Sequence, residues 1–188
     1  MTEFRLRVPA GRIRDLANRY EDPDDDVIDR VIAPRIRKLG YVRKPDFIRL
    51  CRWKTPRSRG HVRKNSETFI RAVTRVAFST ADERLRIEVL TLLDGVDWPT
   101  ASVILHFGHR DPYPILDVRA LWSLGFDKPP SYDFGFWRAY TLFCRTLSRR
   151  FSCSMRALDR ALWQYSKEKQ KPTAGRGRRA PRKASRGA

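Results

Sequence analysis

The chain has 188 residues, with 40 Lys or Arg against 21 Asp or Glu, so its formal net charge is +19. This length favours one compact domain. Hydrophobic residues make up 41% and aromatic residues 11%, which excludes a wholly disordered chain. No run approaches the length of a membrane span and no secretion signal opens the sequence. We therefore expect a soluble, intracellular protein with no membrane partner.

The positive charge is the first indication of function. So large an excess of positive charge destabilises a compact chain by self-repulsion, and it most often serves to bind a polyanion. Nucleic acid is therefore the leading candidate partner. Residues 167–188 hold nine Lys or Arg, one Glu and no large apolar residue, which predicts a disordered basic tail. Removing the tail's +8 leaves +11 on residues 1–166. The folded part is therefore basic in itself. The tail either binds phosphates or only keeps the chain soluble.

Apolar spacing is helical almost throughout, with strand-like alternation only at 4–8, so an all-α fold is expected. Pro34 is expected to break or kink the first long helix. The acidic residues 22–26 are interpreted as favourable charges at a helix start rather than a cation site. Besides the segment treated below, helices are predicted over 21–32, 46–55, 66–77, 82–93, 131–147 and 152–165.

Cysteines and histidines give no metal set. Cys51, Cys144 and Cys153 are too few and too widely spaced for a disulfide framework or a four-ligand site, so we expect reduced thiols in the core. His106 and His109 lie three residues apart without a cysteine or carboxylate to complete a site. No metal is expected, and His106 is predicted to be buried or hydrogen-bonded.

The most informative segment runs from residue 92 to residue 105. Apolar residues precede a turn at Gly95, and a new apolar helix begins at Pro99, which predicts two short helices joined by a tight hairpin. Such a turn exposes successive backbone N–H groups, a natural seat for a phosphate oxygen. The candidate DNA-binding residues of the turn are Gly95, Val96, Asp97, Trp98 and Thr100.

This segment resembles the helix-hairpin-helix motif, with the hairpin at about 85–107. Together with the Pro-rich loop and helix at about 108–125, it resembles the HhH-GPD superfamily of base-excision DNA glycosylases. The loop closes on Pro-Ile-Leu-Asp, and Asp117 follows Gly95 by 22 residues, the separation that the superfamily pattern leads one to expect. The match covers roughly 85–125. It implies a two-lobed helical fold over 1–166 with a DNA groove between the lobes.

The resemblance implies that Asp117 is the catalytic residue. Breaking a base-to-sugar bond builds positive charge on the sugar, and a fixed carboxylate stabilises that charge and orients an attacking water. The structural alternative is that Asp117 only caps the helix that it precedes. The two roles are compatible, because a cap would also hold the carboxylate in place.

Three departures from the family pattern shape the expected activity. Members that also cut the strand carry a Lys where this chain has Pro99, so the resemblance implies a monofunctional enzyme that uses water. The hairpin reads Gly-Val-Asp rather than Gly-Val-Gly, which puts the Asp97 carboxylate close to the expected phosphate. The Cys-rich iron-sulfur loop of some members is missing from the sequence, so no cluster and no other cofactor is expected.

A glycosylase must also hold the flipped base. The resemblance points to the stretch around Trp53, which stacks on the base or acts as a wedge, with Arg52, Lys54 and Arg57 on phosphates. The alternative makes Trp53 a core residue and the cations a solvated face.

The expected function is DNA repair by a monofunctional N-glycosylase that acts on a damaged or mispaired base in double-stranded DNA. The alternative is a non-catalytic helix-hairpin-helix protein that recognises DNA structure or damage. RNA binding through the tail is a weaker third reading. We expect a monomer in the cytoplasm, associated with the nucleoid if the source is bacterial.

Overall fold

The structure is a computed structural model that describes residues 3–56 and 59–170. Every regular element in those ranges is helical, which confirms the all-α prediction. None of these helices is both long enough and apolar enough to cross a lipid bilayer. The elements are η1 (Ala10–Arg12), α1 (Ile13–Asn18), α2 (Asp25–Val27), η2 (Ile28–Ile32), α3 (Ala33–Leu39), α4 (Lys44–Lys54), α5 (Arg59–Val62), α6 (Glu67–Ser79), α7 (Glu83–Glu88), η4 (Val89–Leu92), α8 (Trp98–Gly108), α9 (Val118–Ser123), α10 (Phe134–Arg150) and α11 (Met155–Lys169).

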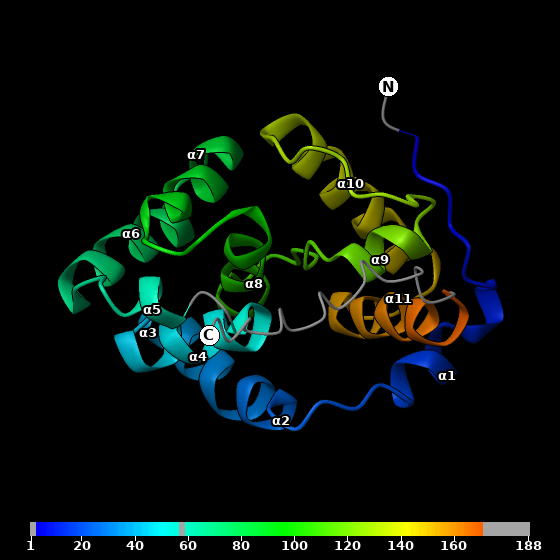
Figure 1. Cartoon of the computed structure of the whole chain (residues 1–188), viewed down its shortest axis with the longest axis horizontal. Helices are drawn as coiled ribbons and strands as arrows, with labels where there is room; N and C mark the ends of the chain where they lie inside the picture. The colour runs from blue at the N-terminus through cyan, green and yellow to red at the C-terminus, as the bar shows by residue number, and fades with distance from the viewer. Residues whose placement is uncertain (1–2, 57–58, 171–188) are drawn as a thin grey trace, which may run out of the picture.

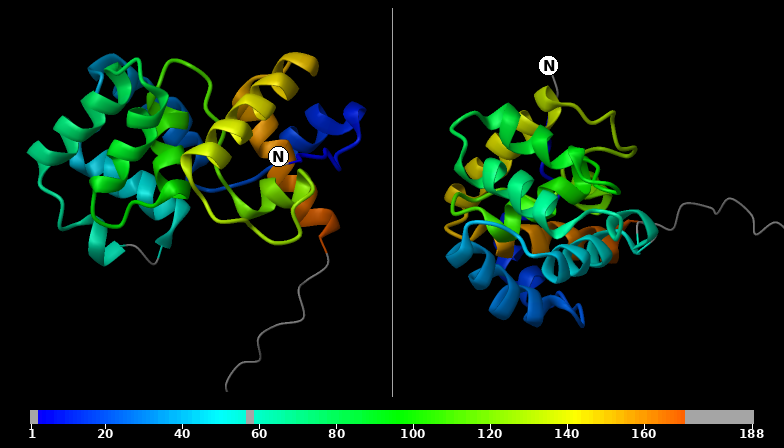
Figure 2. Two further views of the ribbon diagram at one scale, coloured as in Figure 1. Left: turned by 90° about the horizontal axis from the view of Figure 1, so that it is seen from above. Right: turned by 90° about the vertical axis from the view of Figure 1, so that its left-hand side faces the viewer.

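Buried apolar side chains form two clusters. The central core takes its residues from Ile28 to Ile115 and adds Trp137. The terminal core combines Val8 to Leu16 with residues 116–162. The chain therefore leaves the terminal core after α1 and returns to it directly after Ile115. Figures 1 and 2 show the same division, with α2 to α8 in one half and α1, α9, α10 and α11 in the other.

Side-chain caps fix where many of the helices begin. Six of them start after a Ser or Asp whose side chain accepts a hydrogen bond from a backbone N–H two or three residues further on. These contacts satisfy donors that have no partner inside the helix. The capping residues are Ser66, Asp82, Asp97, Asp117, Asp133 and Ser154.

Two local predictions need correction. The segment 4–8 is extended but forms no strand, because its partner is a helix end: the amides of Arg5 and Arg7 donate to the carbonyls of Leu124 and Ser123 at 2.9 and 2.8 Å. Pro34 does not break the chain's first long helix. It lies in the first turn of α3, where no N–H donor is needed, and follows the π-helical turn η2.

Two predicted helix boundaries also shift. Helix α10 begins at Phe134 rather than at residue 131, because Asp133 caps it. Helix α11 continues to Lys169, three residues into the predicted tail, since the spacing of its buried residues persists to Ser166. Residues 171–188 of the predicted tail lie outside the described residues.

A network of charged side chains joins the two halves. Arg156 and Arg160 of α11 pair with Asp25 and Asp29, which belong to the chain around α2 and η2. Arg156 also bonds Asp159 on its own helix at 2.9 Å. Asp25 is 6% exposed and lies in the first turn of α2, which confirms the interpretation of this carboxylate as an acid at a helix start, and it also pairs with Arg156 and Arg160 across the cores.

Candidate functional site

The hairpin forms where it was predicted, between η4 and α8. Gly95 has φ +78°, a left-handed conformation that other residues rarely adopt. A Cβ at this position would also lie 3.0 Å from both His61 Cβ and Val62 Cγ1. Backbone angle and close approach therefore both require glycine here.

Asn65 holds the hairpin in place. Its Nδ2 donates to the carbonyls of Val62 and Asp94, both at 3.0 Å, and its Oδ1 accepts from the Asp94 amide at 2.9 Å. The side chain is 4% exposed, so these bonds are buried. Sequence reasoning missed Asn65, because nothing in its surroundings relates it to a turn 30 residues further on.

The turn leaves some of its amides open to a ligand. The Val96 amide donates to Leu93, and the Thr100 amide donates to Asp97 Oδ1. Among the described residues, the amides of Gly95, Asp97 and Trp98 have no acceptor. Of the five predicted phosphate contacts, the side chains of Val96 and Thr100 are buried. The amides of Val96 and Thr100 already have acceptors, so the open amides belong to Gly95, Asp97 and Trp98.

Asp97 is explained by its local bonds. Its Oδ1 accepts both the Thr100 amide at 3.1 Å and the Thr100 hydroxyl at 2.8 Å, which caps α8. A glycine at this position would leave both donors without this acceptor.

The loop before Asp117 is tied to the hairpin helix. Ser102 on α8 accepts from the Leu116 amide at 2.8 Å and donates to the Pro99 carbonyl at 2.6 Å. Tyr140 on α10 donates to the Ile115 carbonyl at 2.7 Å. These bonds fix the residues directly before Asp117 against the first turns of α8. These bonds bring the start of the hairpin helix and Asp117 together.

Both oxygens of Asp117 are engaged. Oδ1 accepts from the Arg119 amide at 2.8 Å, which makes Asp117 the cap of α9, and Oδ2 pairs with Lys54 Nζ at 2.6 Å. The two side chains are 20% and 11% exposed. Burial alone raises the pKa of Asp117, but the charge and hydrogen bond of Lys54, with the amides of Arg119 and Ala120, outweigh it. The pKa therefore lies below its ordinary value, and Asp117 is ionised at neutral pH.

Lys54 lies elsewhere than the sequence suggested. We expected it on a phosphate, but it lies at the end of α4 and crosses from the central core to Asp117 in the terminal core. The two residues are 63 positions apart, so no local pattern connects them. A buried acid on α11, Asp159, lies within electrostatic reach of both.

Trp53 is partly buried against the central core, and its ring meets that of Phe107 edge-on with centroids 5.6 Å apart. Trp53 also lines a hollow of about 570 Å³, together with Ile48 and Arg52. Arg52 is exposed at the rim of this hollow. Arg57 lies outside the described residues.

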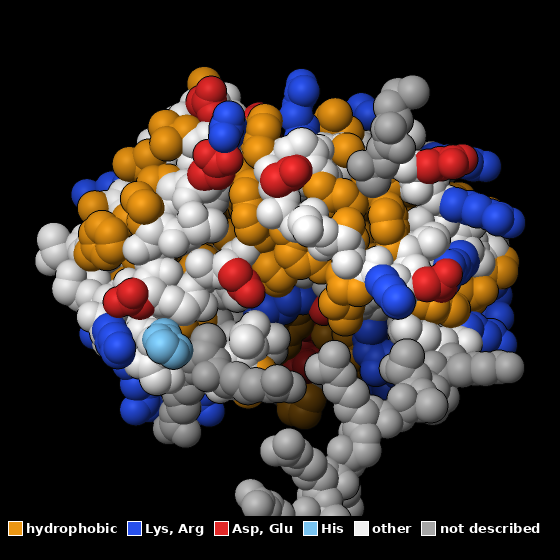
Figure 3. All heavy atoms as spheres, turned by 45° about the horizontal axis from the view of Figure 1, so that its top comes forward, with side chains coloured by type: hydrophobic (Ala, Val, Ile, Leu, Met, Phe, Trp, Pro, Cys, Tyr) orange, Lys and Arg blue, Asp and Glu red, His pale blue; other side chains and the backbone are white. Residues whose placement is uncertain are grey.

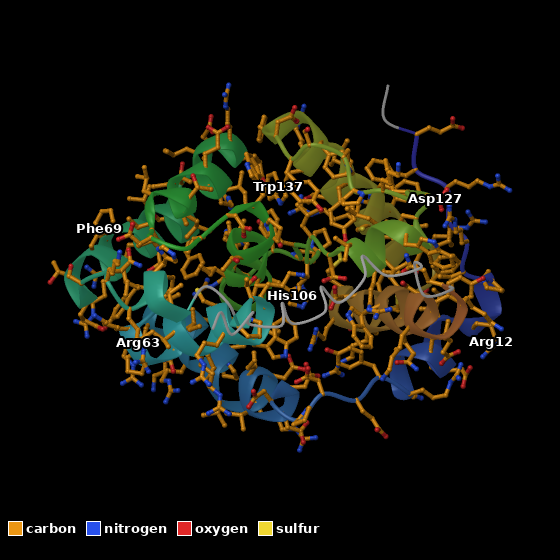
Figure 4. The ribbon with its side chains drawn as sticks, in the orientation of Figure 1. Arg12, Arg63, Phe69, His106, Asp127 and Trp137 are labelled. Carbon is orange, nitrogen blue, oxygen red and sulfur yellow. The ribbon has the colours of Figure 1, made fainter. Side chains whose placement is uncertain are left out.

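His106 is buried near the middle of the molecule (Figure 4). Its Nδ1 donates to the Tyr113 carbonyl at 2.6 Å, which confirms the predicted hydrogen bond. Burial and the charge of Arg156 lower the pKa of His106 to about 3, so the ring is neutral. In the described part of the chain, no group of three His, Cys, Asp or Glu could hold a metal ion.

The surface between the two halves is hollowed, and acidic and basic side chains both lie in the hollow (Figure 3). The described cysteines are free, with Cys51 and Cys144 buried, which confirms the prediction of reduced core thiols.

The chain matches no family model, no curated protein and no solved structure. Its likeness to HhH-GPD glycosylases therefore rests on the residues of the hairpin and of the Asp117 loop alone.

Proposed function

We propose that the protein binds double-stranded DNA and acts in base-excision repair as a monofunctional N-glycosylase, with Asp117 as the catalytic carboxylate. The observation that carries this proposal is the placement of Asp117: the amide of its neighbour Leu116 is bonded to Ser102 on the hairpin helix, and Lys54 keeps the Asp117 carboxylate ionised. In this reading the two cores are the two lobes of an HhH-GPD-like fold, and the duplex lies between them.

The reaction needs a carboxylate that is charged and fixed. As the base leaves, positive charge develops on the sugar, and an ionised Asp117 stabilises it. A water molecule then adds its oxygen to the anomeric carbon and gives up a proton, while the departing base gains one. In this proposal Lys54 is a positioning residue, because it acts through its ion pair with Asp117. The hairpin supplies no amine, since Pro99 stands where strand-cutting relatives of this fold carry a Lys.

Charge and the hairpin support DNA as the partner. The net charge of +11 on residues 1–166 favours a polyanion, and the open amides of Gly95, Asp97 and Trp98 suit one phosphate. Arg52, at the rim of the hollow beside Trp53, adds a contact for the backbone. We propose a monomer that acts in the cytoplasm, on the nucleoid in a bacterium.

The second candidate is a non-catalytic DNA-binding protein. It is favoured by the engagement of both Asp117 oxygens, which is what a purely structural cap and ion pair would show. In that case the protein recognises DNA structure or damage and the ion pair serves only to join the cores.

A lesion panel separates the two candidates. Duplexes with oxidised, alkylated, deaminated or mispaired bases are incubated with the protein, treated with alkali and examined for strand breaks. We expect breaks on one lesion that Asp117→Asn abolishes while binding is retained. Asp133→Asn is the matched control, because Asp133 caps α10 in the same way at 2.8 Å and should leave the product unchanged.

Two results would contradict the proposal. Binding without breaks on every lesion would support the non-catalytic candidate. Strand breaks that form without alkali would show a lyase and remove the monofunctional assignment.

A further inference from the structure

A hollow of about 460 Å³ lies at the C-terminal end of α8, the end opposite the hairpin. Eleven residues of helix separate the two ends, which is about 16 Å. We call this hollow the arginine pocket, because guanidinium groups from three different segments border it. Its lining residues are Arg37, Gly40, Arg75, Phe78, Ser79, Gly108, His109, Arg110 and Asp111.

The three arginines of the pocket have no carboxylate partner within the described residues. Arg37 and Arg110 make no hydrogen bond, ion pair or ring contact there. Arg75 only stacks over the Tyr41 ring, with its Cζ 4.8 Å from the ring centroid. By contrast, Arg71 on the same helix face pairs with Glu67 at 2.6 Å. Like charges gathered around a pocket whose lining holds a single acid, Asp111, cost free energy that a bound anion would offset.

A buried cation, Arg86, lies behind the lining residue His109. His109 lines the pocket, and its Nε2 lies 2.6 Å from Arg86 Nη1. Arg86 is 6% exposed and its described partners are His109, the Tyr113 hydroxyl and the Thr80 carbonyl, none of them charged in this state. Burial and the charge of Arg86 lower the pKa of His109, although the carboxylates of Asp111 and Glu83 act in the opposite direction. A charge in a low-dielectric interior acts strongly on its surroundings.

The pocket also has a defined shape. A Cβ on Gly108 would lie 2.3 Å from Phe78 Cζ and 3.0 Å from Ile36 Cγ2, so glycine is what lets the Phe78 ring reach the backbone of α8. The ring and this backbone form a packed wall beside the guanidinium groups. The acid in the lining, Asp111, has a side chain that is 65% exposed and stands at the rim.

We propose that the arginine pocket binds a phosphorylated small molecule, with the phosphoryl group held by Arg37, Arg75 and Arg110. Planar guanidinium groups bond anionic oxygens in pairs, and a phosphoryl group offers three such oxygens and nearly two charges to three arginines, where a carboxylate offers two oxygens and one charge. The site lies beyond the hairpin and Asp117, so the proposal does not depend on the proposed glycosylase activity. The competing explanation is that Arg37 and Arg110 only complement the carbonyl ends of α3 and α8.

Titration calorimetry of the full-length protein with inorganic pyrophosphate tests the proposal. We expect saturable binding at one site that the triple variant Arg37→Gln, Arg75→Gln, Arg110→Gln weakens at least tenfold. The matched control replaces three exposed arginines outside the pocket, Arg14, Arg138 and Arg149, by Gln and removes the same charge. It should change the affinity less than twofold, and circular dichroism should show both variants folded.

Several outcomes would overturn the proposal. Lack of saturable binding would mean that the arginines serve the helix ends, and equal weakening in both triple variants would mean that general charge holds the pyrophosphate. Displacement of pyrophosphate by a Glu-rich peptide at equal concentration would point to an acidic protein partner instead. Displacement by a short undamaged duplex would make the pocket part of a DNA surface. Resistance to both competitors would support a separate phosphate site.

Discussion

In the described part of the chain, two ionic contacts join the central core to the terminal core, and they shift the pKa values of their carboxylates in opposite directions. Lys54 and Asp117 form a single pair at 2.6 Å, and the pKa of Asp117 is lowered. In the network of Arg156 and Arg160, burial raises the pKa of Asp25 and raises that of Asp159 to about 6. The first contact keeps one acid charged. In the second, burial outweighs the attraction of the two cations for Asp25 and Asp159, which suits a structural joint better than chemistry.

The surroundings of the two cations explain part of this difference. The Arg156 guanidinium lies over the rings of Tyr20, Trp53 and Phe107, 5.1–5.7 Å from their centroids. Its side chain is 14% exposed and it bonds acids from both cores. Lys54 offers a single flexible amine to a single acid. Loss of Arg156 should therefore damage the fold more than loss of Lys54.

Arg156→Met should have the largest effect on stability. The change leaves Asp159 without its cation and leaves Asp25 and Asp29 to Arg160 alone, so the free energy of unfolding should fall by about 3–5 kcal/mol. Urea denaturation at neutral pH measures it. Arg138→Met, at an exposed position on α10, is the control and should change stability by less than about 0.5 kcal/mol. A loss below about 1 kcal/mol for Arg156→Met would contradict the structural role of the network.

Lys54→Met should cost less, about 2–3 kcal/mol, because Asp117 keeps its bond from the Arg119 amide and some exposure. The double variant Lys54→Met, Asp117→Asn should recover most of this loss, since no unpaired carboxylate is then left. A double-mutant cycle in urea gives the coupling energy. Purely additive losses would mean that the ion pair does not join the cores.

The pH dependence of stability should separate the two contacts. The raised pKa of Asp159 means that the folded chain binds this proton more tightly than the unfolded chain. The contribution of Asp159 to the free energy of unfolding therefore grows by about 2–3 kcal/mol as pH falls from above 6 towards 4. Asp117 has the opposite sign: its lowered pKa gives stability that is present above about 4 and is lost as pH falls further.

Asp159→Asn tests this assignment. Because His106, with its pKa lowered to about 3, loses stability over the same range, removal of Asp159 should make the unfolding free energy fall more steeply from pH 7 to pH 4. Urea denaturation at steps of half a pH unit measures this slope. Asp127→Asn is the control, because the Asp127 side chain is 80% exposed and should leave the curve unchanged. An unaltered slope in Asp159→Asn would show that another group titrates in this range.

Features that depend on neighbours in the sequence were predictable. Helical spacing and capping residues located most helices, because each depends on contacts three or four residues apart. Gly95 marked the turn for the same reason, and Asp117 marked the start of α9. The candidate catalytic position could therefore be named before its surroundings were known.

Partners from distant segments were not predictable. Lys54 meets Asp117 across 63 positions and Arg156 meets Asp25 across 131 positions. A helical pattern says which face of a helix is buried, but not which other helix covers it or at what height. Residues 22–26 were for that reason interpreted locally, as acids at a helix start, although Asp25 is held by α11.

The smallest effect should come from the acid next to Asp25 in the sequence. Asp24 pairs with Arg49 at 2.7 Å, but the two side chains are 52% and 46% exposed, so solvent screens the pair. Asp24→Asn should change the free energy of unfolding by less than about 0.5 kcal/mol. Asp25→Asn, which removes one buried acceptor shared by Arg156 and Arg160, should shift the thermal midpoint measurably more. Equal shifts of the thermal midpoint in Asp24→Asn and Asp25→Asn would mean that the buried ion pairs of Asp25 stabilise the fold no more than the exposed pair of Asp24.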